Sequence, residues 1–292
     1  MAEAHSLTAR ARALLDPLKL DEVVLRALAE DLGSGDITTE AIFSDEVASA
    51  VILAKAPGVI AGLPVAERVF QLVDPEIEFT PHIRDGEKVA TGANIATLTG
   101  RVASILRAER TALNFLQRMS GIATLTAQIV GEVSQYNVKI LDTRKTAPGL
   151  RVLDKFAVRA GGGFNHRMGL YDGVLLKDNY IRAAGGIGKA VSLAREHVPM
   201  TVKIEVETTT LAEVEEAVQS GAEIIMLDNM RPAQMKQAVD LIDGRALIEA
   251  SGGVTLENVR EVAATGVDFI SIGALTHSPK ALDLSLEIHD YE

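Results

Sequence analysis

The chain contains no cysteine among its 292 residues. Disulfide frameworks, thiolate nucleophiles and zinc or iron–sulfur centres held by cysteine are therefore excluded. The sequence also lacks any run of about 18 uncharged apolar residues, so no transmembrane helix and no membrane partner are expected. The first 15 residues carry Arg10 and Arg12 but no apolar signal-peptide core. The cytoplasm is the expected location, and an amphipathic organelle-targeting role for residues 1–15 is the alternative.

Positive charge is scarce and unevenly distributed. The chain has 29 Lys and Arg against 40 Asp and Glu, a net charge of −11. Binding to a nucleic acid is not expected, because it depends on Lys and Arg that neutralise phosphates. Residues 142–178 are the exception, with seven Lys or Arg against four Asp. A local basic region in an acidic protein predicts a small anionic ligand rather than a polymer.

Polar residues that directly follow apolar, strand-like runs are the most informative pattern. Glu207, Asp228, Ser251 and Gly273 each follow such a run and are spaced by 21, 23 and 22 residues, with helix-like stretches between them. A strand–helix repeat of this length predicts an α/β barrel with its active site at the carboxyl ends of the strands. The predicted strands lie near 139–142, 173–176, 202–206, 223–227, 246–250 and 269–272. Six strands are two fewer than a standard barrel has.

The first third of the chain lacks this period and reads as α+β. Its predicted elements are a helix over 18–32, strands within 47–60, a helix over 63–72, short strands over 85–95 and a helix over 105–133. An interruption of the last helix is expected near Ser120-Gly121. We therefore expect an N-terminal α+β domain over 1–115, completed by a C-terminal helix over 276–292, and a catalytic open barrel over 116–275.

Two basic motifs favour an anion-binding site. Arg144 and Lys145 end the first barrel strand, and arginine binds planar anions through two hydrogen bonds. Taken alone, this pair is more typical of a solvated loop. Three glycines at 161–163 precede His166 and Arg167. Because consecutive glycines are conformationally costly, this second motif favours a ligand over a merely flexible loop.

The remaining strand-end residues leave several roles open. Lys177 suits a Schiff base, an anion contact or simple exposure to solvent. The Glu207 and Asp228 carboxylates suit Mg²⁺ or sugar hydroxyls, acid–base catalysis or structural ion pairs. Glu205 has the strand parity of Glu207 and is expected to point the same way, and a structural role is its alternative. Together, these groups indicate a phosphosugar that meets a small polycarboxylate.

Small residues follow the last two strands. They are Ser251, Gly252, Gly253, Gly273 and Ala274. Barrels of this kind commonly bind a phosphate at this position through backbone N–H groups at a helix N-terminus. A phosphate site is therefore predicted here.

Eight motifs, in their order along the chain, resemble the quinolinate phosphoribosyltransferase family over nearly the full length. They are Glu109-Arg110-Thr111-Ala112-Leu113-Asn114, Asp142-Thr143-Arg144-Lys145-Thr146, Asn165-His166-Arg167, Leu176-Lys177-Asp178-Asn179, Glu205-Val206-Glu207, Met226-Leu227-Asp228-Asn229, Ser251-Gly252-Gly253 and Gly273-Ala274-Leu275-Thr276-His277-Ser278. The family pattern Lys-Asp-Asn-His ends here in Tyr180, which leaves any role of that position open.

The resemblance implies that quinolinate and phosphoribosyl pyrophosphate react with Mg²⁺ to give nicotinate mononucleotide, pyrophosphate and CO₂, a step of NAD biosynthesis. It implies a sandwich-like α/β domain joined to an incomplete, open barrel. It also implies a homodimer in which Arg110 is lent to the neighbouring site, and a higher oligomer is left open.

The resemblance also implies the site residues. Quinolinate would be bound by Thr143, Arg144, His166, Arg167 and Lys177, together with Arg110. The 5′-phosphate would be bound by Ser251, Gly252, Gly253, Gly273 and Ala274. Lys145 would serve phosphoribosyl pyrophosphate, Glu207 and Asp228 the ribose and Mg²⁺, and the catalytic residues would be Glu207, Asp228, Lys145 and Lys177.

Three rival functions remain open. They are a relative of the same fold that acts on another ring acid, such as the molybdenum-transport-associated homologues, a Schiff-base aldolase that uses Lys177, and a non-catalytic metabolite-binding protein.

Overall fold

The computed structural model describes residues 15–291. Apart from Leu15, the candidate targeting segment lies outside these residues. Contacts divide the chain into two compact units. The first contains the residues up to Ala127, Thr146–Gly162 and those from Thr276 onward; the second contains Gln128–Lys145 and Gly163–Leu275.

The boundary expected after residue 115 is therefore displaced, because residues 116–127 and 146–162 belong to the first unit. Close packing explains the difference. A Cβ added at Gly161 would lie only 2.5 Å from the Ala123 carbonyl oxygen, so the segment that ends in Gly161 runs directly against the helix that contains Ala123.

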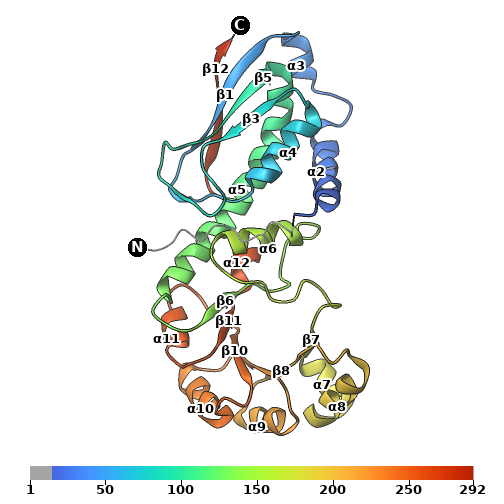
Figure 1. Cartoon of the computed structure of the whole chain (residues 1–292), viewed down its shortest axis with the longest axis vertical. Coiled ribbons are helices and arrows are strands. Elements are labelled where there is room, and N and C mark those ends of the chain that lie inside the picture. Colours follow the sequence, from blue (N-terminus) through green and yellow to red (C-terminus); the bar gives the residue numbers. More distant parts are fainter. Residues whose placement is uncertain (1–14, 292) are drawn as a thin grey trace. The chain divides into compact units, whose positions relative to one another are not determined.

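The first unit is built on a four-stranded antiparallel sheet in the order β12-β1-β5-β3 (Figure 1). The sheet strands are β1 (Val47–Ala54), β3 (Glu78–Pro81), β5 (Asn94–Arg101) and β12 (Leu284–Tyr291), and the short pair is β2 (Gly58–Val59) with β4 (Lys88–Val89). The helices are α2 (Pro17–Leu32), α3 (Ile37–Ile42), α4 (Leu63–Val73), α6 (Arg151–Ala160) and most of α5 (Val102–Glu132).

The C-terminal helix expected over 276–292 is wrong. After the short α12 (Ala274–His277), the chain forms the strand β12, which pairs with β1 from Leu284 to Tyr291. The apolar residues Leu284, Leu286 and Ile288 alternate with polar ones, which is the period of a strand. Without β12, the hydrogen-bonding edge of β1 that does not face β5 would be exposed, so tertiary pairing decides the conformation.

The expected interruption of the long helix is also absent, because α5 continues through Ser120 and Gly121. Both residues serve packing instead. The Ser120 hydroxyl accepts a hydrogen bond from the Ala61 N–H at 3.1 Å. A Cβ at Gly121 would lie 2.2 Å from the Lys280 carbonyl oxygen, so the glycine permits the segment that leads to β12 to pass directly over the helix.

The second unit is a six-stranded parallel sheet in the order β6-β11-β10-β9-β8-β7. The strands are β6 (Lys139–Leu141), β7 (Val174–Leu176), β8 (Ile204–Thr208), β9 (Ile224–Asp228), β10 (Leu247–Ser251) and β11 (Phe269–Ser271). Each predicted run therefore overlaps a strand, and β8, β9 and β10 extend one or two residues beyond the predicted ends. Among the described residues, no ladder joins β6 to β7, so the barrel is open there, as expected.

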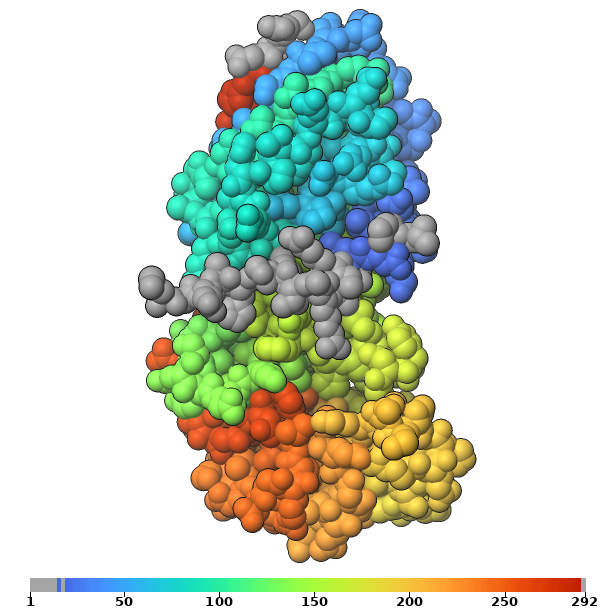
Figure 2. All heavy atoms as spheres, viewed as in Figure 1, coloured from blue at the N-terminus to red at the C-terminus, as the bar shows by residue number. Residues whose placement is uncertain are grey.

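Helices cover the outer face of this sheet (Figure 1). They are α8 (Ile187–His197), α9 (Leu211–Gln219), α10 (Pro232–Ile242) and α11 (Val259–Ala263), with the short α7 (Asp178–Ala184) after β7. The yellow and orange segments that contain α7 to α10 form much of the visible surface of this unit (Figure 2). None of the helices between residues 15 and 291 combines the length and apolar character that a membrane crossing requires.

The two faces of the parallel sheet have opposite chemistry. The outward residues Val206, Leu227 and Ala250 are fully buried and apolar. The inward positions Glu205 and Glu249 are also buried but charged. A standard barrel fills its interior with branched apolar side chains. The polar interior of this unit is therefore a specific feature that needs a chemical explanation.

Candidate active site

The carboxyl ends of the six parallel strands bring most of the predicted residues to one edge of the second unit. Arg144 and Lys145 follow β6, and Lys177 follows β7. Glu207 is the residue before the last in β8, and Asp228 and Ser251 are the last residues of β9 and β10. Gly273 follows β11. Parallel strands place their carboxyl ends together, which is why residues over 100 positions apart share this edge.

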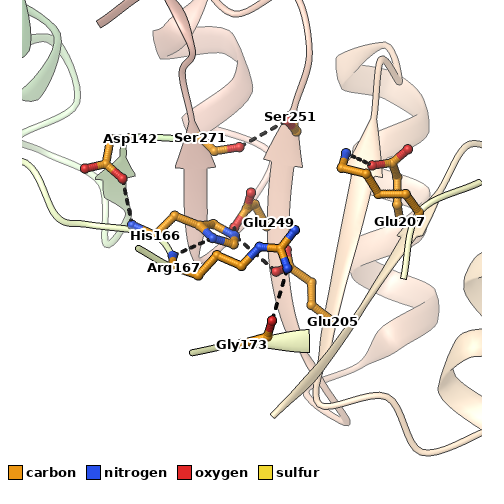
Figure 3. A network of polar contacts seen from close by, with 10 residues as sticks. Asp142, His166, Arg167, Gly173, Glu205, Glu207, Glu249, Ser251 and Ser271 are labelled. Atoms are coloured by element: carbon orange, nitrogen blue, oxygen red, sulfur yellow. Dashed lines mark hydrogen bonds and ion pairs between the residues drawn. The ribbon is translucent and has the colours of Figure 1, made fainter. Parts of the chain in front are cut away.

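Asp142 orders the segment that carries the basic side chains. It is fully buried, and its carboxylate accepts hydrogen bonds from the His166 N–H at 2.9 Å and from Asn165 Nδ2 at 2.6 Å (Figure 3). Phe164 forms a parallel bridge with Leu141 of β6. These contacts fix the backbone of the segment that contains His166 and Arg167.

His166 contacts two buried carboxylates. Its Nε2 atom lies 3.0 Å from Glu205 Oε2 and 3.4 Å from Glu249 Oε2 (Figure 3). Burial alone would lower the pKa of His166, but the hydrogen bonds to Glu205 and Glu249 outweigh it and raise this pKa to about 10. Burial also raises the pKa of Glu205. His166 and Glu205 therefore both hold their protons to a higher pH than the separate side chains would.

The hydrogen bond made by the other ring nitrogen, Nδ1, shows which nitrogen of the His166 ring carries a proton. His166 Nδ1 accepts a hydrogen bond from the Arg167 N–H at 2.8 Å. An accepting nitrogen carries no proton. The ring therefore carries a proton on Nε2, which is directed at Glu205 and Glu249.

Arg167 and Arg144 place two positive charges close together. Burial lowers the pKa of Arg167, and the charge of Arg144 lowers it further. Arg167 Nη1 donates to the Gly173 carbonyl oxygen at 3.1 Å, which holds the guanidinium in place. We call Arg144, His166 and Arg167 the basic cluster. Two adjacent guanidinium groups favour a ligand with more than one negative charge.

Lys177 and Glu207 form an ion pair at the ends of β7 and β8 (Figure 3). The lysine side chain is 47% exposed, whereas that of Glu207 is 11% exposed. Lysines that form Schiff bases are activated by desolvation or by a neighbouring cation, and Lys177 has a carboxylate and solvent instead. This environment disfavours the aldolase alternative. Asp228, on the next strand, accepts a hydrogen bond from Asn229 Nδ2 at 2.8 Å.

The turn after β10 requires glycine. Gly252 and Gly253 have φ values of +88° and +64°, a region that other residues rarely adopt. A Cβ at Gly252 would lie 2.2 Å from Asn229 Oδ1, so this glycine also permits a close approach. Before the turn, the Ser251 and Ser271 hydroxyls lie 3.1 Å apart. The loop thus presents backbone groups and hydroxyls beside Asp228.

Four residues that the sequence singled out need separate description. Thr143 is half-buried, and its hydroxyl accepts a hydrogen bond from the Lys145 N–H at 3.0 Å, which shapes the turn after β6. The Lys145 side chain is exposed. Arg110 is not part of the second unit: it lies on α5 in the first unit, with its side chain 58% exposed and 3.7 Å from Glu109. Tyr180, at the position that departs from the family pattern, is 57% exposed on α7.

The sequence analysis missed Glu249. A signal was present, because Glu249 interrupts an apolar strand at the same parity as Ser251 and two residues before it. Residues two apart on a strand share a face, so this parity placed Glu249 inside the barrel. What the sequence did not show is that His166, 83 positions earlier, meets it there.

Comparison with known proteins gives a consistent family. The chain matches the family models described as quinolinate phosphoribosyl transferase, N-terminal domain, over residues 36–120 and C-terminal domain over residues 122–287. A probable nicotinate-nucleotide pyrophosphorylase [carboxylating] from Bacillus subtilis is 43% identical over 274 residues, covering 94% of this chain and 95% of the relative. A quinolinate phosphoribosyltransferase [decarboxylating] from Nicotiana glauca, named as mitochondrial, is 46% identical over 289 residues, covering 92% of this chain and 82% of the relative.

Solved structures agree with the sequence relatives. The nicotinate-nucleotide pyrophosphorylase from Francisella tularensis has a TM-score of 0.91 and 43% identity, and the match covers 94% of this chain and 98% of that one. Both domains, their order and the open barrel are thus shared along almost the whole length. The family suggested by the eight motifs is confirmed: this chain belongs to the quinolinate phosphoribosyltransferase family.

Proposed function

We propose that this protein transfers the phosphoribosyl group of phosphoribosyl pyrophosphate to the ring nitrogen of quinolinate, with loss of CO₂, to give nicotinate mononucleotide and pyrophosphate. The basic cluster is the observation that carries the proposal. Quinolinate has two adjacent carboxylates, and the paired charges of Arg144 and Arg167 complement a dianion better than a monoanion. Family membership supports the same reaction.

The other strand-end residues suit the second substrate. Lys145 and Lys177 provide cations for pyrophosphate and carboxylate groups. The turn formed by Ser251, Gly252 and Gly253 offers backbone N–H groups and a hydroxyl for the 5′-phosphate, and Gly273 and Ala274 follow the neighbouring strand β11. Glu207 on β8 and Asp228 on β9 lie between Lys177 and this turn in the strand order, where the ribose would lie.

Mg²⁺ is the proposed cofactor. The donor set fits it, because Glu207 and Asp228 offer carboxylate oxygens on neighbouring strands and Mg²⁺ prefers oxygen ligands. These two residues would hold the ion together with phosphate oxygens of the substrate. When bound, it would neutralise charge on the leaving pyrophosphate.

The side chains of the protein account for the rest of the mechanism. Positive charge develops at the anomeric carbon as pyrophosphate leaves, and the carboxylates of Glu207 and Asp228 would stabilise it. The basic cluster would hold the ring nitrogen against that carbon. After the carbon–nitrogen bond forms, the ring is cationic and accepts the electron pair released when the adjacent carboxylate leaves as CO₂. A proton then replaces that carboxylate on the ring.

A homodimer is part of the proposal, with higher assembly left to measurement. Arg110 would complete the quinolinate site of the partner subunit, which gives a role to an exposed arginine that forms a 3.7 Å ion pair with Glu109. We place the protein in the cytoplasm. Because the relative from Nicotiana glauca is named as mitochondrial, fractionation of the native cells is the appropriate check.

The test of the reaction is a Mg²⁺-dependent assay with quinolinate and phosphoribosyl pyrophosphate that follows nicotinate mononucleotide and CO₂. Nicotinate, which has one carboxylate, is the parallel substrate. We expect product from quinolinate and little or none from nicotinate. Equal rates for the two acids would contradict the dicarboxylate site, and a folded protein with no product from either would reject the reaction.

An Arg144→Ala variant localises the dicarboxylate site. Loss of a charge-assisted contact of about 1.5–3 kcal/mol should raise KM for quinolinate by roughly 10- to 100-fold. KM for phosphoribosyl pyrophosphate should change little. Arg182→Ala is the matched control, because Arg182 lies on α7 and its side chain is 78% exposed. Its ion pair with Asp178 is long, at 3.9 Å. If both KM values rise equally, Arg144 does not belong to the quinolinate site.

A further inference from the structure

Two buried carboxylates lie beneath the basic cluster, and the proposed reaction assigns them no role. Glu205 on β8 is 3% exposed and Glu249 on β10 is 2% exposed. The strand β9 separates β8 from β10 in the sheet, so the two side chains approach each other across the interior of the barrel. We call Glu205 and Glu249 the acidic pair. Burying two carboxylates costs several kcal/mol unless hydrogen bonds and opposite charges compensate.

The compensation comes from the basic cluster. His166 Nε2 lies 3.0 Å from one carboxylate and 3.4 Å from the other. In the same segment, the Arg167 N–H donates to His166 Nδ1 at 2.8 Å. Both nitrogens of the ring therefore have partners within the protein. The imidazole is a link between the acidic pair and the backbone of Arg167 (Figure 3).

Each carboxylate also has an oxygen without a partner. Glu205 Oε1 and Glu249 Oε1 are buried and accept no hydrogen bond from any described residue. Structures rarely retain such atoms without a reason. The negative charge of Glu205 acts electrostatically on the guanidinium of Arg167 and opposes the effect of Arg144 on it. Glu205 therefore supplies a counter-charge that offsets the repulsion between Arg144 and Arg167 before an anion binds.

A cation held by His166, Glu205 and Glu249 is the competing interpretation, since their ligand atoms lie within 4.8 Å of one another. A metal on Nε2 requires that this atom carry no proton, and the proton of a neutral ring would then be on Nδ1. Such a proton would point at the Arg167 N–H, which now donates to Nδ1. The geometry therefore favours an Nε2–H donor over a metal ligand.

We infer that Glu205 and Glu249 are positioning residues for the dicarboxylate substrate: through His166 they fix the backbone and the charge of Arg167. His166 then acts as a link rather than as a direct donor from its ring to the substrate. This inference rests on the proposed function in that it takes quinolinate as the ligand of the basic cluster. It assigns specificity to residues in the barrel interior that do not themselves touch the substrate.

The first test is kinetic. Glu249→Gln keeps the size of the side chain but removes its charge, and we expect KM for quinolinate to rise about tenfold or more. KM for phosphoribosyl pyrophosphate should stay within about twofold, because the phosphate loop is not disturbed. Glu215→Gln is the matched control, since Glu215 is exposed on α9. A folded Glu249→Gln enzyme with unchanged KM for quinolinate, or with both KM values raised equally, would overturn the inference.

The second test needs no substrate. Proton–nitrogen correlation NMR of the wild-type imidazoles, with His166 assigned from the spectrum of His166→Gln, should show a slowly exchanging proton on Nε2. Absence of that proton, or stoichiometric binding of Mn²⁺ or Zn²⁺ that removes it, would establish the cation site instead. If wild-type enzyme makes no product while this proton is present, the proposed reaction fails but the link between His166 and the acidic pair stands.

Discussion

At the scale of single residues, protonation connects the interior of the barrel to its stability. The pKa of His166 is raised from 6.5 to about 10 in the folded protein, because its hydrogen bonds to Glu205 and Glu249 outweigh the opposing effect of burial. Between these two values the folded state holds a proton that the unfolded chain has released. The resulting stabilisation is complete below about pH 6.5 and is lost as the pH rises through about 10.

This sign gives a measurable prediction. The free energy of unfolding of the wild type should fall more steeply between pH 7 and pH 10 than that of His166→Gln. One pKa unit corresponds to about 1.4 kcal/mol. Between pH 7 and pH 10, the free energy of unfolding of the wild type should therefore fall by about 2 kcal/mol or more beyond the fall seen for His166→Gln. Urea denaturation at three pH values measures it. Lysine and tyrosine side chains titrate in both proteins, so the comparison uses the slope of the free energy of unfolding against pH. Equal slopes for the wild type and His166→Gln would contradict the proposed effect of His166.

The position of the polar residues at the strand ends is the feature of the site that the sequence predicted best. The polar residues after each strand could be read from spacing alone, because parallel strands with regular connections place their ends together. The contacts beneath them could not be predicted that way. Glu249 meets His166 only because the segment after the glycines at 161–163 turns into the barrel, and Asp142 holds it there. Such a long-range hydrogen bond leaves no periodic trace in the sequence.

At the scale of elements, local pattern and tertiary pairing gave different answers for the C-terminus. The tail contains apolar and charged residues that also suit a short amphipathic helix. In the structure, β1 is paired on one side with β5 and on the other with β12. The hydrogen bonds between β1 and β12 outweigh the weak preference of the C-terminal segment for a helix. Tertiary context easily overrides such a local propensity. Six barrel strands, by contrast, were predictable because their apolar runs are short, buried and regularly spaced.

The strand assignment predicts the effect of Leu284→Ala. Leu284 is 3% exposed, so its truncation should lower the free energy of unfolding by about 2–4 kcal/mol. Ser285→Ala is the control, because the neighbouring side chain points to the opposite face of a strand and is only half-buried. Its effect should be below about 1 kcal/mol. Chemical denaturation measures both, and equal losses for the two variants would argue against the observed register.

At the scale of the whole molecule, the proposed site needs a residue that the second unit does not contain. The other residues assigned to substrate binding lie in that unit, but Arg110 lies on α5 in the first unit and its side chain is 58% exposed. In a two-fold symmetric dimer, a residue at the interface of one subunit can reach the site of its neighbour. If Arg110 is lent in this way, each active site is assembled from two chains.

Shared sites make inactive subunits complement each other. A heterodimer of one Arg110→Ala chain and one Lys177→Ala chain has one site with both defects and one with none. Purified through two different affinity tags, it should therefore recover about half of the wild-type activity, as expected for a two-fold symmetric pair of sites. A heterodimer of Lys177→Ala and Glu207→Gln is the control. Lys177 and Glu207 form an ion pair within one chain, so each of its sites retains a defect and activity should not return. Absence of recovery in the first heterodimer, once its composition is verified by mass spectrometry, would place Arg110 outside the catalytic site.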